Sequence, residues 1–112
     1  MKLTIYDVDY APKELSAQVP IEVDLLRMIP GSDRPDYWLE KTKLPLKWLD
    51  NDIEKSIPHI IVCARWVGTE IGTNFKKLPV GIAYITDQTL LEDEVLSFEK
   101  CKYIAIGTAS VT

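Results

Sequence analysis

The stretch from residue 57 to residue 68 most constrains how this chain can fold. It reads Ile-Pro-His-Ile-Ile-Val-Cys-Ala-Arg-Trp-Val-Gly and is the densest apolar and β-branched run in the sequence. A run of this length, opened near a proline and closed by a glycine, indicates a buried strand rather than a helix. Side chains alternate across a strand, so the strand has two faces. One face is wholly apolar and should meet the core; it consists of Ile60, Val62, Ala64 and Trp66. The opposite face would carry His59, the only histidine, and Arg65.

The hydrophobic pattern predicts an α+β fold, with one domain over residues 1–112 and a mainly antiparallel sheet of about five strands. Residues 20–29 fit both a strand and a helix, and although the bracketing prolines Pro20 and Pro30 favour a strand, the choice stays open. Two or three short helices are expected from prolines, an aspartate cap and a Thr-x-x-Glu capping box. We expect the strands near 3–9, 44–49, 57–67, 80–86 and 102–111, and the helices near 12–18, 35–42 and 90–99.

The composition is that of a soluble globular protein, with 46% hydrophobic and 27% charged residues. The formal net charge is -4, and an acidic chain repels phosphate backbones, so we expect no nucleic-acid partner. The first residues lack the apolar core of a signal peptide, and no stretch approaches the ~18 apolar residues of a membrane span. We therefore expect a cytoplasmic protein without a membrane partner, in which Cys63 and Cys101 are reduced and packed.

The sequence carries no signature of a named reaction, so whether the chain is an enzyme stays open. Cys63 and His59 are a nucleophile and a base, but four residues along a strand span about 13 Å, beyond hydrogen-bond reach. Two distant cysteines and one histidine do not make a zinc site. The run that starts at Asp50 lacks the glycine and the final glutamate of a calcium loop. We expect neither a metal nor a cofactor.

Small residues recur on two of the predicted strands, and this is the least ordinary feature of the sequence. Glycine weakens a strand unless something approaches it closely. If the two strands are neighbours, their bare faces form a shallow depression. A helix, a bulky side chain such as Trp66 or Trp38, or an outside ligand would then fill it. The bare faces consist of Gly81 and Ala83 on one strand, and of Ala105, Gly107 and Ala109 on the other.

Arg65 stands in an otherwise apolar run and must find a partner, since an unpaired buried charge is very costly. That partner is either a carboxylate of the chain, at Asp7, Asp9 or Glu70, or an anionic ligand held by the planar guanidinium. The irregular stretch at 68–78 is long enough to be functional. The ligand-binding hypothesis therefore places five residues around a pocket over strands 80–86 and 102–111, namely Arg65, His59, Asn74, Gly81 and Gly107.

Our leading hypothesis is a protein that works through protein–protein contact. Small acidic proteins that neutralise a basic nuclease or toxin share this size and charge, so an inhibitor or immunity-like regulator fits. Tyr37, Trp38 and Trp48 lie near turns and helix ends and are the expected interface anchors, because tyrosine and tryptophan often anchor interfaces. The alternative is a small-molecule binder or enzyme for an anionic ligand. A homodimer built on an edge strand is a third hypothesis.

Overall fold

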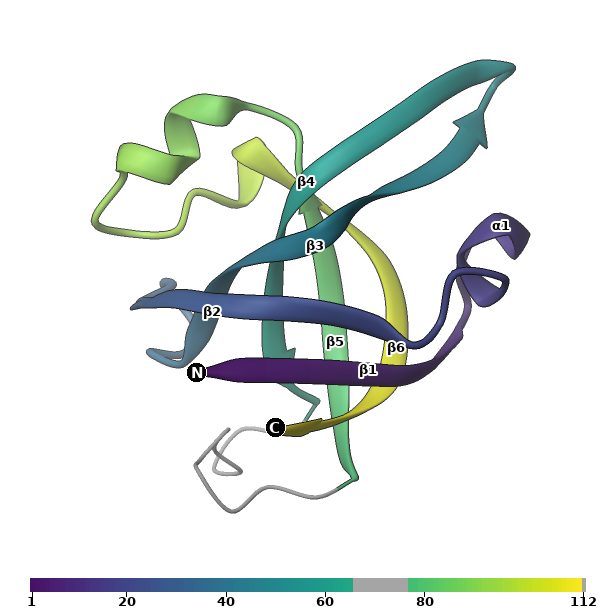
Figure 1. The fold of residues 1–112 in the computed structure, drawn as a ribbon. Coiled ribbons are helices and arrows are strands. Elements are labelled where there is room, and N and C mark those ends of the chain that lie inside the picture. Colours follow the sequence, from purple (N-terminus) through teal and green to yellow (C-terminus); the bar gives the residue numbers. More distant parts are fainter. Residues whose placement is uncertain (66–76, 112) are drawn as a thin grey trace.

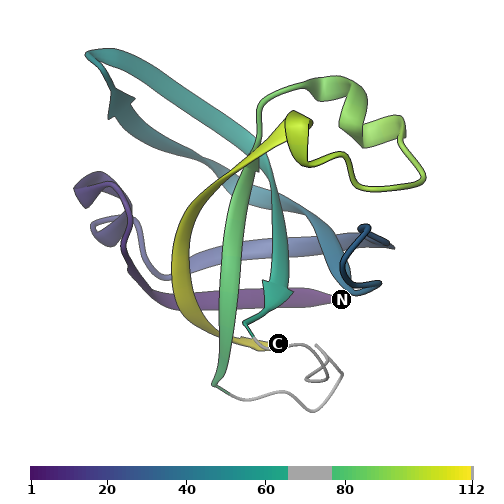
Figure 2. The same ribbon diagram turned by 180° about the vertical axis from the view of Figure 1, so that it is seen from behind.

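The computed structural model describes residues 1–65 and 77–111 and shows a closed β-barrel. Six antiparallel strands follow one another around the wall in chain order, and the last strand pairs with the first. Figures 1 and 2 show the barrel from opposite sides, with the chain termini at one end. The strands are β1 (Lys2–Asp9), β2 (Ile21–Ile29), β3 (Tyr37–Asp50), β4 (Ile53–Ala64), β5 (Leu78–Ile85) and β6 (Cys101–Val111). The helical elements are α1 (Lys13–Ser16) and the 3-10 turns η1 (Gln88–Glu92) and η2 (Phe98–Lys100).

The α+β prediction is wrong, because the sheet is closed and helices contribute little. Residues 20–29, which the pattern left open, form β2 and supply a sixth strand. With it the sheet curls until β6 pairs with β1, from Leu3 opposite Val111 to Asp9 opposite Ile106. Closure pairs backbone groups that an open sheet of five strands would leave at its two edges.

The helices expected at 35–42 and 90–99 are replaced by other structures. β3 runs as one long strand from Tyr37, and Asp33 accepts the Tyr37 hydroxyl at 2.9 Å instead of capping a helix. In the second segment the cap is Asp87, whose Oδ1 accepts the Thr89 N–H at 3.0 Å, and only η1 and η2 form. The helix expected at 12–18 shortens to the four residues of α1.

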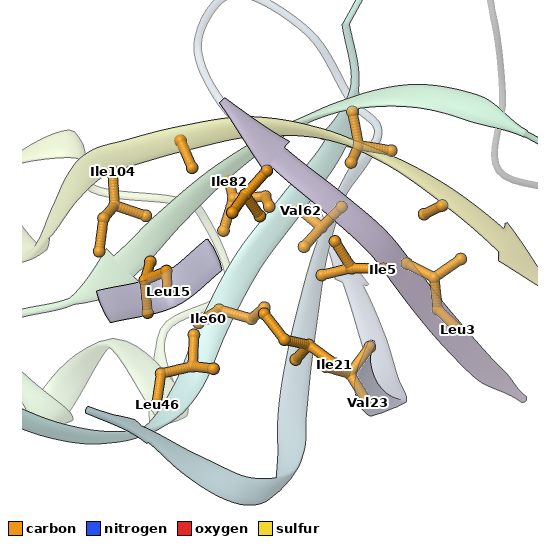
Figure 3. Close-up of a cluster of buried hydrophobic side chains, with 14 of the residues drawn as sticks. Leu3, Ile5, Leu15, Ile21, Val23, Leu46, Ile60, Val62, Ile82 and Ile104 are labelled. Atoms are coloured by element: carbon orange, nitrogen blue, oxygen red, sulfur yellow. The ribbon is translucent and has the colours of Figure 1, made fainter. Parts of the chain in front are cut away.

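The interior of the barrel holds the larger hydrophobic cluster, shown in Figure 3. Alternate residues of each strand point inward, as the period of a strand requires. Removing this apolar surface from water is the main force that holds the wall closed. Trp66, which we expected on this face, lies outside the described residues. The most buried inner side chains include Leu3, Ile5, Val23, Ile60, Val62, Val80 and Ile82.

A second hydrophobic cluster lies outside the wall, beneath residues 86–100, which Figure 1 shows as a green segment beside the barrel. Arg27 fastens this segment to the barrel, because its Nη2 donates to the carbonyl oxygens of Leu91 and Asp93. The Leu96 N–H also donates to the Pro30 carbonyl at 2.7 Å. These hydrogen bonds hold the segment against the outer face of the barrel. The cluster consists of Ile29, Leu39, Ile61, Ile85, Leu90 and Leu96.

β3 and β4 continue past the barrel wall as a projecting hairpin, visible in Figures 1 and 2. Its turn is at Asn51 and Asp52, with φ values of 50° and 65°, a conformation that Asn and Asp tolerate better than most residues. Beside α1, the Gln18 side chain accepts the Lys47 N–H at 3.0 Å and donates to the Lys47 carbonyl. The pairing of β3 with β2 ends at Thr42, so Gln18 satisfies backbone groups of β3 that β2 does not reach.

Candidate binding site

The outer faces of β4, β5 and β6 and the segment around η2 enclose a hollow of about 400 Å³. Volumes of this size fall within the range of ~300–1,000 Å³ seen for ligand pockets. Its floor is low at Gly81 and Ala83, which carry little or no side chain. The hollow is mainly apolar, and its lining combines aromatic rings, two thiols and one cation, in the form of Tyr37, Phe98, Tyr103, Cys63, Cys101 and Arg65.

Tyr37 builds one wall of the hollow. Its ring meets the Phe98 ring edge to face, with centroids 5.9 Å apart and planes at 75°. Its hydroxyl donates to the Asp33 carboxylate, with Oδ1 and Oδ2 at 3.0 and 2.9 Å. Burial, together with the Asp33 carboxylate, raises the pKa of Tyr37 above its ordinary value, so the phenol keeps its proton. Tyr37 is therefore a fixed and neutral part of the wall.

Arg34 holds the Tyr37 wall against the end of β4. Its guanidinium donates two parallel hydrogen bonds to the Asp36 carboxylate, from Nε to Oδ1 at 2.5 Å and from Nη2 to Oδ2 at 2.6 Å. Its Nη1 donates to the Ala64 carbonyl at 2.8 Å. Only 8% of Arg34 is exposed, and its guanidinium carbon lies 5.8 Å from the Tyr37 ring centroid. The sequence did not reveal the role of Arg34, because an arginine between Asp33 and Asp36 is typical of a solvent-exposed turn.

The two thiols of the hollow are not activated nucleophiles. Burial is the main cause that raises the pKa of Cys63, with the neighbouring Arg34 acting in the opposite direction. Burial likewise raises the pKa of Cys101. Since the thiolate is the reactive form, both sulfurs are less reactive than an exposed cysteine. Within residues 1–65 and 77–111, no group of three or more His, Cys, Asp or Glu side chains is arranged to hold a metal ion.

Segment 86–103, which supplies Phe98 and Tyr103 to the lining of the hollow, has an exposed surface that is both apolar and acidic. Val95, Phe98 and Tyr103 are 59%, 47% and 58% exposed, although large apolar side chains usually avoid water. Within residues 86–103 only Asp93 and Lys100 form a close ion pair among the described residues, at 2.6 Å. The surface of segment 86–103 therefore carries excess negative charge around apolar side chains. Its charged residues are five acids against two lysines, namely Asp87, Glu92, Asp93, Glu94 and Glu99 against Lys100 and Lys102.

The structure gathers some of the proposed ligand-binding residues and separates others. Arg65 and Gly81 both line the hollow, and Arg65 is exposed rather than buried. His59 lies opposite Lys41 and does not line the hollow, and burial followed by the Lys41 charge lowers the His59 pKa. Gly107 lies opposite Val80 on the inward face. Asn74 lies outside the described residues.

The two small-residue faces point to opposite sides of the wall, so they do not form one depression. Gly81 lies opposite Ile106 on the outer face. Gly107 instead faces the interior, where a Cβ would come within 2.5 Å of the Asp7 carbonyl oxygen. The close approach of β1 thus fills the space over Gly107, while the space over Gly81 stays open as the hollow.

The three expected interface anchors also separate. Tyr37 lines the hollow, as described above. Trp38 is half-buried and packs against the inner core. Trp48 is only 4% exposed and meets the Tyr84 ring edge to face at 5.0 Å. Trp48 is therefore a core residue, and sequence reasoning passed over Val95, Phe98 and Tyr103, whose exposure depends on the path of residues 86–103.

Comparison of the chain with protein-family models, with curated proteins and with solved structures finds no match. Among the described residues, no helix is long and apolar enough to cross a membrane.

Proposed function

We propose that this protein acts by binding a basic protein partner through the apolar hollow and the acidic surface of segment 86–103. One observation carries the proposal: exposed Val95, Phe98 and Tyr103 share a short segment with five acids and two lysines. Interface centres are rich in aromatic residues that a partner desolvates. The surrounding carboxylates would attract a positively charged partner and disfavour acidic ones.

The shape of the surface favours insertion of a partner side chain over strand addition. The barrel wall is closed, so its strands are already paired on both sides along the hollow. The low floor at Gly81 leaves room of about 400 Å³ between Tyr37, Phe98 and Tyr103. An apolar side chain of the partner would fill this space, with basic residues beside it facing Glu94 and Glu99.

A partner of this kind places the protein among inhibitors or immunity-like regulators of basic enzymes, such as nucleases or toxins. Net charge supports this class, since the whole chain carries -4 and steering by opposite charge speeds association. We also propose a cytoplasmic location, supported by two cysteines that form no disulfide with each other.

Affinity capture with matched variants tests this function. The full chain is immobilised and exposed to lysate of its source cells at about 50 mM and about 300 mM salt. We expect a basic protein that the chain holds at low salt and loses with Phe98→Ala or Glu94→Lys. Asp52→Lys makes a matched charge change at the hairpin tip and should leave capture unchanged. Equal capture by all variants, or no capture at low salt, would contradict the proposal.

The purified partner then gives the second readout. Its affinity for the chain should fall with Phe98→Ala, and its own enzymatic activity should fall on binding if the chain is an inhibitor. Sedimentation of the chain alone shows whether the same surface pairs two copies instead, in which case Phe98→Ala should release monomers.

A small anionic ligand is the second candidate, supported by Arg65 at the edge of the apolar hollow. Thermal unfolding with 2-naphthoate, and with neutral 2-naphthamide as the control, separates this candidate from the first. A ligand site predicts that the carboxylate stabilises the chain more than the amide does, and that Gly81→Val abolishes the difference. Equal effects of the two compounds would remove this candidate and leave the protein-binding proposal standing.

A further inference from the structure

Glu40 is a fully buried acid without a partner. Its exposed fraction is 0%, and neither carboxylate oxygen has a hydrogen-bond partner within residues 1–65 and 77–111. In the register of the sheet it lies opposite Leu25 on β2 and Ile60 on β4, both members of the inner core. A carboxylate in such surroundings loses its hydration without compensation, so the closed barrel favours the protonated, neutral acid.

Among the residues that the structure describes, no group around Glu40 offers a compensating charge. On β3 the next inward residue is Thr42, whose hydroxyl donates a hydrogen bond to the Pro58 carbonyl at 3.2 Å. Tyr84 on β5 lies opposite Ile60 and is the titratable side chain of the inner core nearest in register. The titratable neighbours Lys41 and His59 lie opposite each other in the adjacent register position. Burial alone accounts for a Glu40 pKa well above the ordinary value.

The wall is irregular beside Glu40. The pairing of β3 with β4 jumps from Lys41 opposite His59 to Leu46 opposite Ile57, so residues 42–45 form a bulge against Pro58. The pairing of β3 with β2 also shifts, between Leu25 and Arg27. Leu44, which strict alternation would turn inward, is 76% exposed. We call residues 42–45 the β3 bulge.

The β3 bulge borders a second hollow on the outer surface, of about 380 Å³, lined by residues 43–47 and by Gln18, Pro20, Ile21 and Glu22. Thr42, only 3% exposed, separates Glu40 from this hollow along the strand. Outward movement of the β3 bulge would therefore bring water to Glu40 without unpairing the rest of the barrel.

We propose that Glu40 is a proton-controlled latch in the barrel wall: the wall is closed while Glu40 holds its proton, and loss of that proton to solvent favours an open state in which the carboxylate meets water through the β3 bulge. In the open state the acid would titrate near its ordinary value of about 4.3. Above that value, opening should become more frequent by up to about tenfold per pH unit, until the closed-state acid also titrates.

Amide hydrogen exchange of the full chain tests the latch. Protection is measured from about pH 5 to about pH 9 and corrected for the intrinsic exchange rate. We expect protection of amides 40–44, 46 and 47 to fall by up to about tenfold per pH unit in the natural chain. Glu40→Gln, which keeps the shape but cannot ionise, should remove this dependence. Glu54→Gln removes an exposed acid of β4 that does not line this hollow and should keep the dependence.

A second measurement needs no variant. Carbon-13 NMR of the side-chain carboxyl groups should show Glu40 titrating well above the exposed glutamates of the natural chain. An ordinary titration of Glu40 near about 4.3 would overturn the proposal. So would unchanged pH dependence in Glu40→Gln, or an equal loss of protection over the whole barrel, because the latch predicts a local opening.

Discussion

The Cys63 Sγ lies 3.6 Å from the point that a Cβ on Gly81 would occupy. This is an ordinary van der Waals distance, so the floor of the hollow can accept a methyl group. Gly107 differs, because its Cβ would stand 2.5 Å from the Asp7 carbonyl oxygen, a backbone atom of the neighbouring strand. The two glycines thus have opposite roles: one leaves space open and the other allows two strands to approach.

The first prediction compares these glycines by substitution with alanine. Gly81→Ala should stabilise the chain by about 0.5 kcal/mol, because glycine costs conformational entropy in a strand. Gly107→Ala should destabilise it by about 1–3 kcal/mol, because β1 must move away. Urea unfolding of the two variants measures both effects. Similar effects of the two substitutions would contradict the assignment of the two faces.

The second prediction concerns the loop that carries Tyr37. Arg34→Lys should cost about 2 kcal/mol of unfolding free energy, because lysine cannot donate to Asp36 by a planar fork and also reach the Ala64 carbonyl. It should also weaken capture of the basic partner by displacing Tyr37. Lys13→Arg, an exchange between the same two residue types at an exposed position of α1 away from the hollow, is the matched control and should change neither property. Unchanged stability of Arg34→Lys would show that the fork is not needed.

The third prediction separates a core aromatic residue from a surface one. Trp48→Ala should destabilise the chain by about 3–5 kcal/mol, because it leaves a cavity beside Tyr84. Phe98→Ala should cost only about 1 kcal/mol, mainly for its contact with Tyr37. Partner affinity should respond in the opposite sense, with a loss of about tenfold or more for Phe98→Ala. Loss of affinity in a folded Trp48→Phe variant would contradict this separation.

The fourth prediction is a loss of stability in acid through Asp36. The Arg34 hydrogen bond is the main cause that lowers the Asp36 pKa in the folded chain. The stabilisation is therefore present above the unfolded-state value of about 3.9 and is lost as pH falls through the folded value. Urea unfolding from about pH 2 to about pH 6 should show this loss, and Asp36→Asn should make the curve flatter in that window. An equally steep curve for Asp36→Asn would rule out this residue as a cause.

The alternation of residues 80–86 and 102–111 predicts strands, and β5 and β6 occupy these segments. Alternation reports which residues share a face, but it does not report which face is inside. A register shift between Ile82 and Ala83 sends Tyr103 outward while Ala105 stays inward. The register itself separates the small residues that we expected to meet, because it pairs Gly81 with Ile106 and Val80 with Gly107.

The closed barrel could not be derived from local pattern. Its closing contact joins Leu3 to Val111 across nearly the whole chain, whereas propensity and capping act over a few residues. Residues 35–42 show the same limit, because a proline after an aspartate fits a helix start as well as a loop before a strand. The structure has the loop, and the hydrogen bond from Arg34 to the Ala64 carbonyl, which supports it, joins residues 30 positions apart in the sequence.

The most direct test of the binding surface is hydrogen exchange of the chain with and without its captured basic partner. We predict that amides at 81–83 and 96–103 gain protection in the complex, and that the hairpin tip at 49–54 does not. Protection confined to the hairpin, or to the hollow beside the β3 bulge, would contradict it.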